Sequence, residues 1–346
     1  MMHEADKIDL KDVSASEMEQ FIAPYGKERY RTTQILRWLY KSGVHSVDEM
    51  TNLPKQFRHD LAGVGRISRL TLERLQTAQD GTKKFLFQLE DENRIETVLI
   101  PGKRRLTLCI STQVGCALGC RFCLTGKTGW KRNLRVSEML NQILAARETL
   151  NQDEIITNIV MMGMGEPLAN SENTLKTIEL MKDPDAFKFS SRRITLSTVG
   201  LVPELERLSK EKRSFRLAIS LNATDEETRR GLMPISQRYP LRKVLEVLRN
   251  FSLRPRERIT FEYVMLDGIN DSPQDARRLI RLLRGLPSKV NLIPLNEAPG
   301  IPFKKSPEEK VDQFQEILMA AGIAAIVRLS KGREISAACG QLGGDG

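Results

Sequence analysis

The chain has 346 residues, and its 54 lysines and arginines against 44 acidic residues give a formal net charge of +10. This length suffices for one large domain plus a small one. No apolar run approaches the length of a membrane-spanning helix, so a soluble protein without a membrane partner is expected. Five cysteines and a polar, charged start favour the reducing cytoplasm, where cysteines bind metals or take part in catalysis. The basic balance favours a polyanionic partner such as RNA.

The first 102 residues are predicted to form two small units. Residues 1–68 have helical periodicity and are expected to make an N-terminal helical accessory domain. Residues 69–102 change to a strand pattern with turn signals between the runs, which predicts an antiparallel β-meander that links this domain to the rest. The expected helices cover residues 14–22, 29–41 and 54–61, and the expected strands cover 72–78, 84–89 and 95–100.

Residues 103–346 alternate between apolar, β-rich runs and helical segments such as 136–150, and they are expected to form the catalytic domain. Six or so βα units imply an α/β fold with a parallel sheet, in which ligands bind at the carboxyl ends of the strands. The expected strands cover residues 106–111, 155–162, 194–198, 215–221, 259–266, 290–295 and 324–329.

Three cysteines, Cys116, Cys120 and Cys123, follow the first of these strands. Their CxxxCxxC spacing can hold three irons of a cubane 4Fe–4S cluster, because thiolates are the ligands that such clusters use. One iron then has no protein ligand and can bind the amino and carboxylate groups of S-adenosylmethionine (SAM). This arrangement is the signature of radical SAM enzymes.

The alternative is a tetrahedral zinc site, with Cys109 or Cys339 as the fourth ligand. Zinc sites usually pair two short CxxC-like units, whereas this chain has one triplet, and its three histidines all lie upstream of it. The spacing therefore favours the iron–sulfur cluster.

A glycine-containing turn at residues 163–167 follows the second strand. Glycines let the backbone approach a ligand closely, and the Glu166 carboxylate can accept hydrogen bonds from an ammonium group. Such a turn is weak evidence alone. After a strand that itself follows the cysteine loop, it is typical of the turn with which radical SAM enzymes hold the methionyl amine.

Six segments together resemble the RlmN type of RNA methyltransferase: residues 116–126, 162–170, 193–200, 233–235, 291–296 and 337–342. The resemblance implies a partial (βα)6-type radical SAM barrel with a 4Fe–4S cluster and SAM as cofactors. It implies methylation of C2 of an adenine in 23S ribosomal RNA (23S rRNA) and of the adenosine beside the anticodon in some transfer RNAs (tRNA).

The resemblance also implies roles for single residues. Cys339 is expected to carry the methyl group, Cys109 to be its partner and Glu96 to be a proton acceptor. The expected SAM contacts are Gly165, Glu166, Ser197, Ser220, Leu221, Asn222 and Asn296. The chain departs from the family pattern at Asn222, where histidine is common, and at residues 331–335.

The chemistry explains why two further cysteines are needed. Adenine C2 is electron-poor and cannot attack a sulfonium methyl group, so a radical route is required. In the scheme that the family implies, a methylene radical on the Cys339 sulfur adds to C2 and leaves the enzyme bonded to RNA. Cys109 then attacks the Cys339 sulfur and leaves a disulfide bond. The alternative is that Cys109, in an apolar strand, is only a buried core residue.

Two other functions stay open at this point. One is the Cfr type of enzyme, which methylates C8 of the same ribosomal adenine, and the other is a zinc-stabilised RNA-binding protein. Residues 296–303 favour the C2 type. An electron donor such as flavodoxin and a monomeric state are expected. Basic residues near strand ends or loops are candidates for phosphate contacts: residues 103–105, Lys127, 131–132, 192–193 and 304–305.

Overall fold

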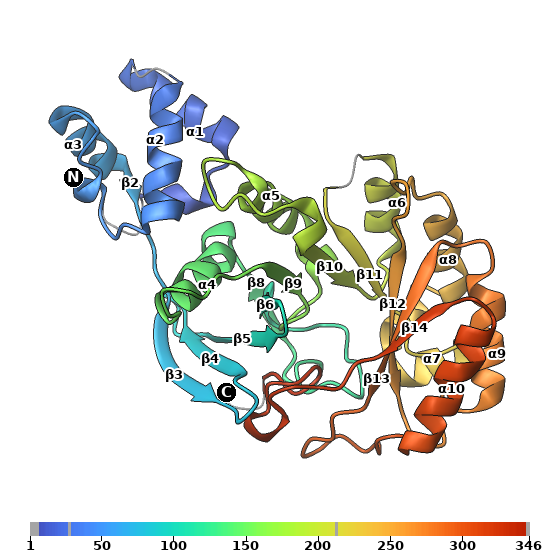
Figure 1. Ribbon diagram of the computed structural model, residues 1–346. Coiled ribbons are helices and arrows are strands. Elements are labelled where there is room, and N and C mark those ends of the chain that lie inside the picture. Colours follow the sequence, from blue (N-terminus) through green and yellow to red (C-terminus); the bar gives the residue numbers. More distant parts are fainter. Residues whose placement is uncertain (1–6, 27–28, 212–213, 344–346) are drawn as a thin grey trace.

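The computed structural model describes residues 7–26, 29–211 and 214–343. A helical module at the N-terminal end lies beside a larger α/β body (Figure 1). In the first helix, α1 (Ala15–Ile22), the Ser14 hydroxyl accepts the Glu17 N–H, and the Glu17 carboxylate accepts the Ser14 N–H. This capping box explains why the helix begins where the sequence predicts.

The rest of the module follows the predicted helices closely. Helix α2 (Tyr30–Arg37) continues into a π-helical turn, and α3 (Lys55–Val64) comes next. A short parallel pair, β1 (Ile8–Asp9) with β2 (Gly65–Arg66), was not predicted, since two residues leave no periodicity to read. The buried Lys11 ammonium donates to Asn141 at 2.7 Å and to the Ser68 carbonyl at 3.0 Å, which fastens the module to the α/β body.

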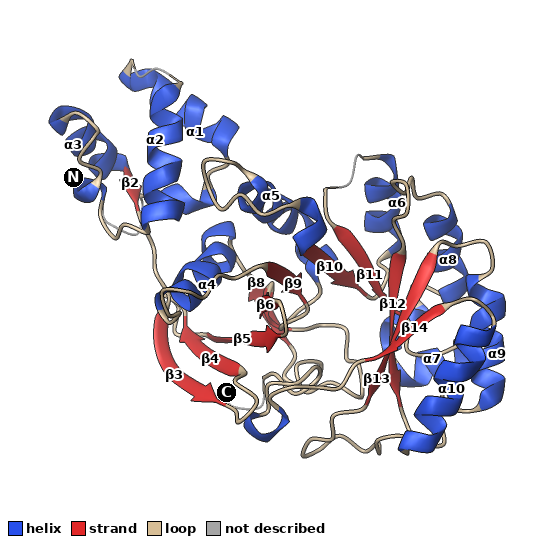
Figure 2. Cartoon of the chain, in the orientation of Figure 1, coloured by secondary structure: helices blue, strands red, loops and turns tan. Residues whose placement is uncertain are grey.

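The α/β body is built on one ten-stranded sheet, with the strand order β14-β13-β12-β11-β10-β9-β6-β5-β4-β3 (Figure 2). Seven strands run parallel: β6 (Arg105–Cys109), β9 (Asn158–Met161), β10 (Ile194–Thr198), β11 (Arg216–Ser220), β12 (Ile259–Met265), β13 (Ser288–Pro294) and β14 (Ala324–Val327). The meander strands are β3 (Thr71–Thr77), β4 (Lys83–Gln88) and β5 (Arg94–Gly102). Because β5 pairs with β6, the predicted meander extends the barrel sheet directly.

Helices join the parallel strands and lie along the outer side of the curved sheet (Figure 1). They are α4 (Val136–Glu148), α5 (Ser171–Lys182), α6 (Val202–Lys210), α8 (Leu241–Arg249), α9 (Pro273–Leu283) and α10 (Glu308–Ala320). The short helix α7 (Glu226–Leu232) lies instead at the strand ends, where its Leu232 packs with Cys120. The fold is therefore the predicted α/β fold with a parallel sheet of successive βα units. No helix in the described part of the chain is long and apolar enough to cross a membrane.

The two faces of the sheet carry different side chains. Phe261 and Tyr263 are fully buried, and the Tyr263 ring lies 5.3 Å from that of Phe314 in α10, so this face packs against the helices. The residues between them point to the opposite, inner face, because successive side chains of a strand alternate. Ser220, Glu262 and Asn291 are in register across β11, β12 and β13 and form a polar row there.

Some predicted strands are longer than the observed ones. The run 155–162 forms a strand only from Asn158, and Ile155 is 73% exposed. The run 324–329 ends as a strand at Val327, and Leu329 is 81% exposed. A hairpin of β7 (Gln113–Gly115) and β8 (Trp130–Asn133), which the sequence did not reveal, brackets the cysteine loop.

Candidate active site

The three predicted cluster ligands lie on one loop between β7 and β8. Cys116 and Cys120 are buried and Cys123 is partly exposed. The hairpin fixes the start of the loop, where the Cys116 N–H donates to the Gly129 carbonyl at 2.8 Å. Gly126 lets the loop fold tightly, since a Cβ there would lie 2.8 Å from the Cys120 carbonyl oxygen. Burial raises the pKa of the Cys116 thiol to about 12 and that of Cys120 well above its ordinary value.

The surroundings of this loop suit a soft, low-polarity metal cluster. Cys120 packs in a cluster of buried apolar side chains, namely Phe122, Val199, Leu232, Met233, Leu266 and Leu295. Within the described ranges, no group of three or more His, Cys, Asp or Glu side chains is arranged to hold a single metal ion. In a 4Fe–4S cluster each thiolate binds a different iron, and three thiols on one loop match that donor chemistry. The residues therefore fit such a cluster.

Glu166 lies at the end of β9, where three strand ends meet. Its carboxylate accepts the N–H groups of Leu168 and Val199, each at 3.0 Å, and the hydroxyl of Thr198. Burial raises the pKa of this carboxyl to about 7. In the part of the chain that the structure describes, no ion pair involves this buried carboxylate, which makes it suited to receive a cation.

The glycines before Glu166 also allow the turn to pack closely against the rest of the protein. A Cβ on Gly163 would lie 2.7 Å from the Ile110 carbonyl oxygen, and one on Gly165 would lie 2.5 Å from the Gln113 Cβ. Both glycines therefore let the turn pack against the protein's own chain after β6. Gln113 then accepts the Glu166 N–H at 2.8 Å, which fixes the turn.

The remaining predicted SAM contacts on β10 and β11 also come to this edge. Ser197 and Ser220 are on the inner face, and Leu221 is fully buried with its N–H bonded to the Glu262 carbonyl at 2.9 Å. Asn222 has a left-handed backbone with φ of 59°, which asparagine tolerates better than most residues. Its amide accepts the Val264 N–H at 2.9 Å, so this side chain also braces β12.

Arg229, which the sequence did not single out, ties these strand ends together. It is fully buried and donates to the carbonyls of Val199 at 2.8 Å and Leu221 at 3.2 Å, and to the Ser236 hydroxyl at 2.9 Å. Burial lowers the pKa of its guanidinium to about 10, so it stays charged at neutral pH. Nothing in the sequence separates it from the exposed Arg230 that follows.

The C-terminal segment brings Cys339 to the cysteine loop. The Gly340 carbonyl accepts the Leu124 N–H at 2.8 Å, and the Leu342 carbonyl accepts the Thr125 hydroxyl at 2.7 Å. The predicted Asn296 amide donates to the Cys339 carbonyl at 3.0 Å. Cys339 is exposed to solvent, yet surrounding protein atoms still desolvate its thiol, and this burial, with the charges of Glu262 and Cys123, raises its pKa to about 11.

Cys109 lies buried in β6 within electrostatic reach of Cys339. Burial first, and then the charge of Cys339, raises the pKa of the Cys109 thiol far above its ordinary value. All five cysteines are free, so the expected disulfide bond is not present in the structure. Cys109 and Cys339 are separate thiols, the first in the β6 strand and the second on the C-terminal segment.

Glu96 shares the inner face of the sheet with Cys109. In the register of β5 and β6, Val98 stands opposite Cys109, and Glu96 is two residues further along the same face. Its carboxylate forms an ion pair with Lys84 at 3.1 Å, both side chains being only 2% exposed, and it accepts the Gly343 N–H. Lys84 was missed because a lysine in a strand pattern usually points to solvent.

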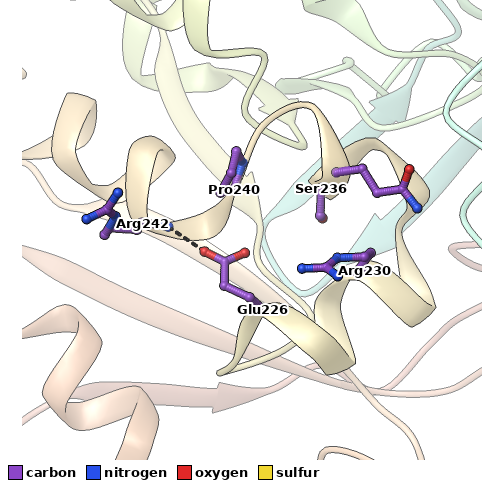
Figure 3. Close-up of a pocket in the computed structure, with 6 residues that line it drawn as sticks. Glu226, Arg230, Ser236, Pro240 and Arg242 are labelled. Atoms are coloured by element: carbon purple, nitrogen blue, oxygen red, sulfur yellow. Dashed lines mark hydrogen bonds between the residues drawn. The ribbon is translucent and has the colours of Figure 1, made fainter.

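A pocket at the turn between α7 and α8 lies apart from these residues (Figure 3). Its Glu226 carboxylate accepts the N–H groups of Leu241 and Arg242, each at 3.0 Å, and so caps the start of α8. None of the predicted site residues lines this pocket, whose members are Glu226, Arg230, Ser236, Gln237, Pro240 and Arg242. The site therefore consists of the strand ends, the cysteine loop and the C-terminal segment.

Comparison with known proteins gives consistent matches. Residues 110–280 match the radical SAM superfamily, and residues 8–67 match the ribosomal RNA large subunit methyltransferase N-terminal domain. The dual-specificity RNA methyltransferase RlmN of Geotalea uraniireducens is 48% identical over 98% of this chain and 97% of its own length. That of Geobacter sulfurreducens is 49% identical over 97% and 92%.

A solved structure matches equally well. The radical SAM methyltransferase from Sphaerobacter thermophilus superimposes with a TM-score of 0.89 at 45% identity, over 97% of this chain and 99% of the other. The relatives' names favour the first function inferred from sequence over the C8-methylating and zinc-stabilised alternatives.

Proposed function

Since the chain belongs to the RlmN family of radical SAM RNA methyltransferases, we propose that it adds a methyl group to C2 of an adenine in 23S rRNA and in tRNA. The family's cofactors are a 4Fe–4S cluster and SAM. Its relatives carry the description "dual-specificity", which supports two classes of RNA substrate. The enzyme is proposed to act as a cytoplasmic monomer that receives electrons from a donor such as flavodoxin.

One observation carries this proposal more than any other. The C-terminal segment places Cys339 against the cysteine loop through the Leu124–Gly340 and Thr125–Leu342 hydrogen bonds, and Cys109 lies within electrostatic reach of it. The proposed methyl carrier, its proposed partner thiol and the predicted cluster loop would thus share one end of the sheet. A zinc-stabilised binding protein would need at most one of the two cysteines outside the loop, as the fourth zinc ligand.

The cofactors would be held by residues of this chain. Cys116, Cys120 and Cys123 would bind the cluster, and Glu166 would accept the methionyl ammonium group of SAM. Gly165, Ser197, Ser220, Leu221, Asn222 and Asn296 would border the rest of SAM. When bound, these groups supply the methyl group and the one-electron chemistry that adenine C2 requires.

Cys339 would carry the one-carbon unit as a thioether and pass it to C2, so that enzyme and RNA become covalently joined. The Cys109 sulfur would then attack the Cys339 sulfur. The sulfur–sulfur bond forms as the carbon–sulfur bond breaks, and the electron pair stays with the carbon, which takes a proton to give the product methyl group. Glu96, on the same face of the sheet as Cys109, would accept the proton lost from C2. A thiol reductant must then restore the two thiols.

The test uses Cys109→Ala with SAM, a reductant and an unmodified tRNA transcript, followed by a denaturing gel. This variant is expected to accumulate covalent protein–RNA complex, because addition to C2 proceeds and release fails. Cys339→Ala is expected to form none, and the double variant is expected to behave like Cys339→Ala. Free methylated RNA produced by Cys109→Ala at the normal rate would make Cys109 a core residue only. Mass spectrometry of the wild-type product distinguishes 2-methyladenine from 8-methyladenine.

A further inference from the structure

Trp130, the first residue of β8, is an exposed aromatic residue that the proposed mechanism does not use. It is 51% exposed, although tryptophan normally buries a large apolar area. Within the described residues, no group accepts a hydrogen bond from its indole N–H, and no other ring or cation stacks on it. One face of a rigid aromatic ring is thus left to solvent.

The position of Trp130 is fixed beside the active site. It pairs with Gly115, the residue before Cys116, and the neighbouring Gly129 carbonyl accepts the Cys116 N–H. Two residues earlier, Thr128 contacts the C-terminal segment, since a Cβ on Gly343 would lie 3.4 Å from its methyl group. Trp130 is therefore held by the same loop that binds the segment carrying Cys339.

The charges around this ring are positive and unneutralised. Lys127, three residues before the ring, donates to the Gly300 carbonyl and so joins this loop to the segment that continues to Lys304 and Lys305. No ion pair is found in the described part of the chain for Lys127, Lys131, Lys304 or Lys305. By contrast, the next arginine, Arg132, is neutralised by Asp91 and Glu138. An exposed ring with Lys127 and Lys131, neither of them ion-paired within the described residues, on its own loop matches a base with its adjoining phosphates.

We propose that Trp130 stacks on an unpaired RNA base near the target adenine, while the surrounding lysines bind the adjoining phosphates. The proposal rests on the RNA-methylating function above and adds a contact to it. Unpaired bases are recognised by stacking on aromatic side chains, and such stacking is tolerant of base identity. One platform thereby serves two RNAs of different sequence. A duplex offers no free base face, so it binds this surface less well.

The chain has two tryptophans, which makes the contact directly observable. Trp38 lies in the helical module with its indole N–H bonded to Asn52 at 2.7 Å. In Trp38→Phe, all tryptophan fluorescence comes from Trp130, and titration with an unmodified tRNA transcript is expected to quench it. Trp130→Phe, in which Trp38 is the sole emitter, serves as the control and is expected to change little. A fully paired RNA of the same length is expected to quench Trp38→Phe less.

Binding measurements complete the test. Trp130→Ala is expected to raise the Kd for the transcript about tenfold, within the range for loss of one stacked base, and Trp130→Phe less. Ile155→Ala removes an even more exposed apolar side chain near the start of β9 and is expected to leave Kd unchanged. Unquenched Trp130 at saturating RNA, or a wild-type Kd for Trp130→Ala, would overturn the proposal. Adenine methylation by the wild type is scored separately, so failure of the proposed function is recognised independently.

Discussion

Glu166 makes the stability of the cofactor-free protein depend on pH in a way that can be calculated. Burial raises the pKa of this carboxyl from 4.5 to about 7. The folded protein therefore holds a proton between these two pH values that the unfolded chain has already released. Because the folded state binds more protons, the free energy of unfolding falls as pH rises through this window.

The size of the effect follows from the two pKa values. At about 1.4 kcal/mol per pKa unit, this rise in the Glu166 pKa changes the free energy of unfolding by about 3 kcal/mol across the window. This contribution is fully present below pH 4.5 and is lost by the time the pH exceeds 7. Glu166→Gln removes the titrating group, so the difference in unfolding free energy between variant and wild type is expected to shift in favour of the variant by about 3 kcal/mol across the window.

Urea denaturation of the cluster-free protein from pH 4.5 to 8 measures this shift. The comparison uses the pH dependence alone, because glutamine cannot accept both the Leu168 and Val199 N–H groups and so carries a constant cost. Parallel profiles for wild type and Glu166→Gln would refute the reasoning, since they would mean that Glu166 titrates alike in the folded and unfolded chain.

Three further substitutions probe the framework of the site. Gly165→Ala is expected to lower the free energy of unfolding, measured by urea denaturation, by at least ~2 kcal/mol, because φ is 97° and the new Cβ meets Gln113. The control Gly231→Ala in α7 has open space around it and is expected to raise the free energy of unfolding by about 0.5–1 kcal/mol. Lys84→Met is expected to lower the free energy of unfolding by about 3–5 kcal/mol, because it leaves the buried Glu96 carboxylate without its cation. The double variant Lys84→Met with Glu96→Gln is expected to recover most of this loss, and additive losses from the two substitutions would contradict the reasoning. Arg229→Met is expected to lower the free energy of unfolding by roughly 3 kcal/mol or more and to weaken SAM binding, measured by calorimetry. A wild-type SAM affinity would show that the Val199 and Leu221 carbonyls keep their positions without Arg229.

The sequence predicts the parts of this protein whose signals are local. The capped helix after Ser14, the strand 194–198 and the cysteine loop were all found where expected, because periodicity, caps and ligand spacing are written in neighbouring residues. The β7–β8 hairpin was missed because its strands are three and four residues long and 14 residues apart. Lys84 and Arg229 were missed because their partners are brought to them only by folding. The resemblance to a family supplied Cys339 and Asn296, which lie far along the sequence from the cysteine loop but are brought close to it by folding.

The two faces of the barrel sheet also bear on how such an enzyme can diversify. Ile219, Phe261 and Leu292 point to the helices and lie in the core, whereas the polar row of Ser220, Glu262 and Asn291 is on the inner face of the sheet. Substitutions in that row alter the polar lining of the interior without removing a core side chain. A lineage can therefore vary inner positions that are not assigned to SAM, such as Asn291, while the outer ones preserve the scaffold. Evolved or engineered changes of specificity are expected to accumulate on alternate residues of each strand.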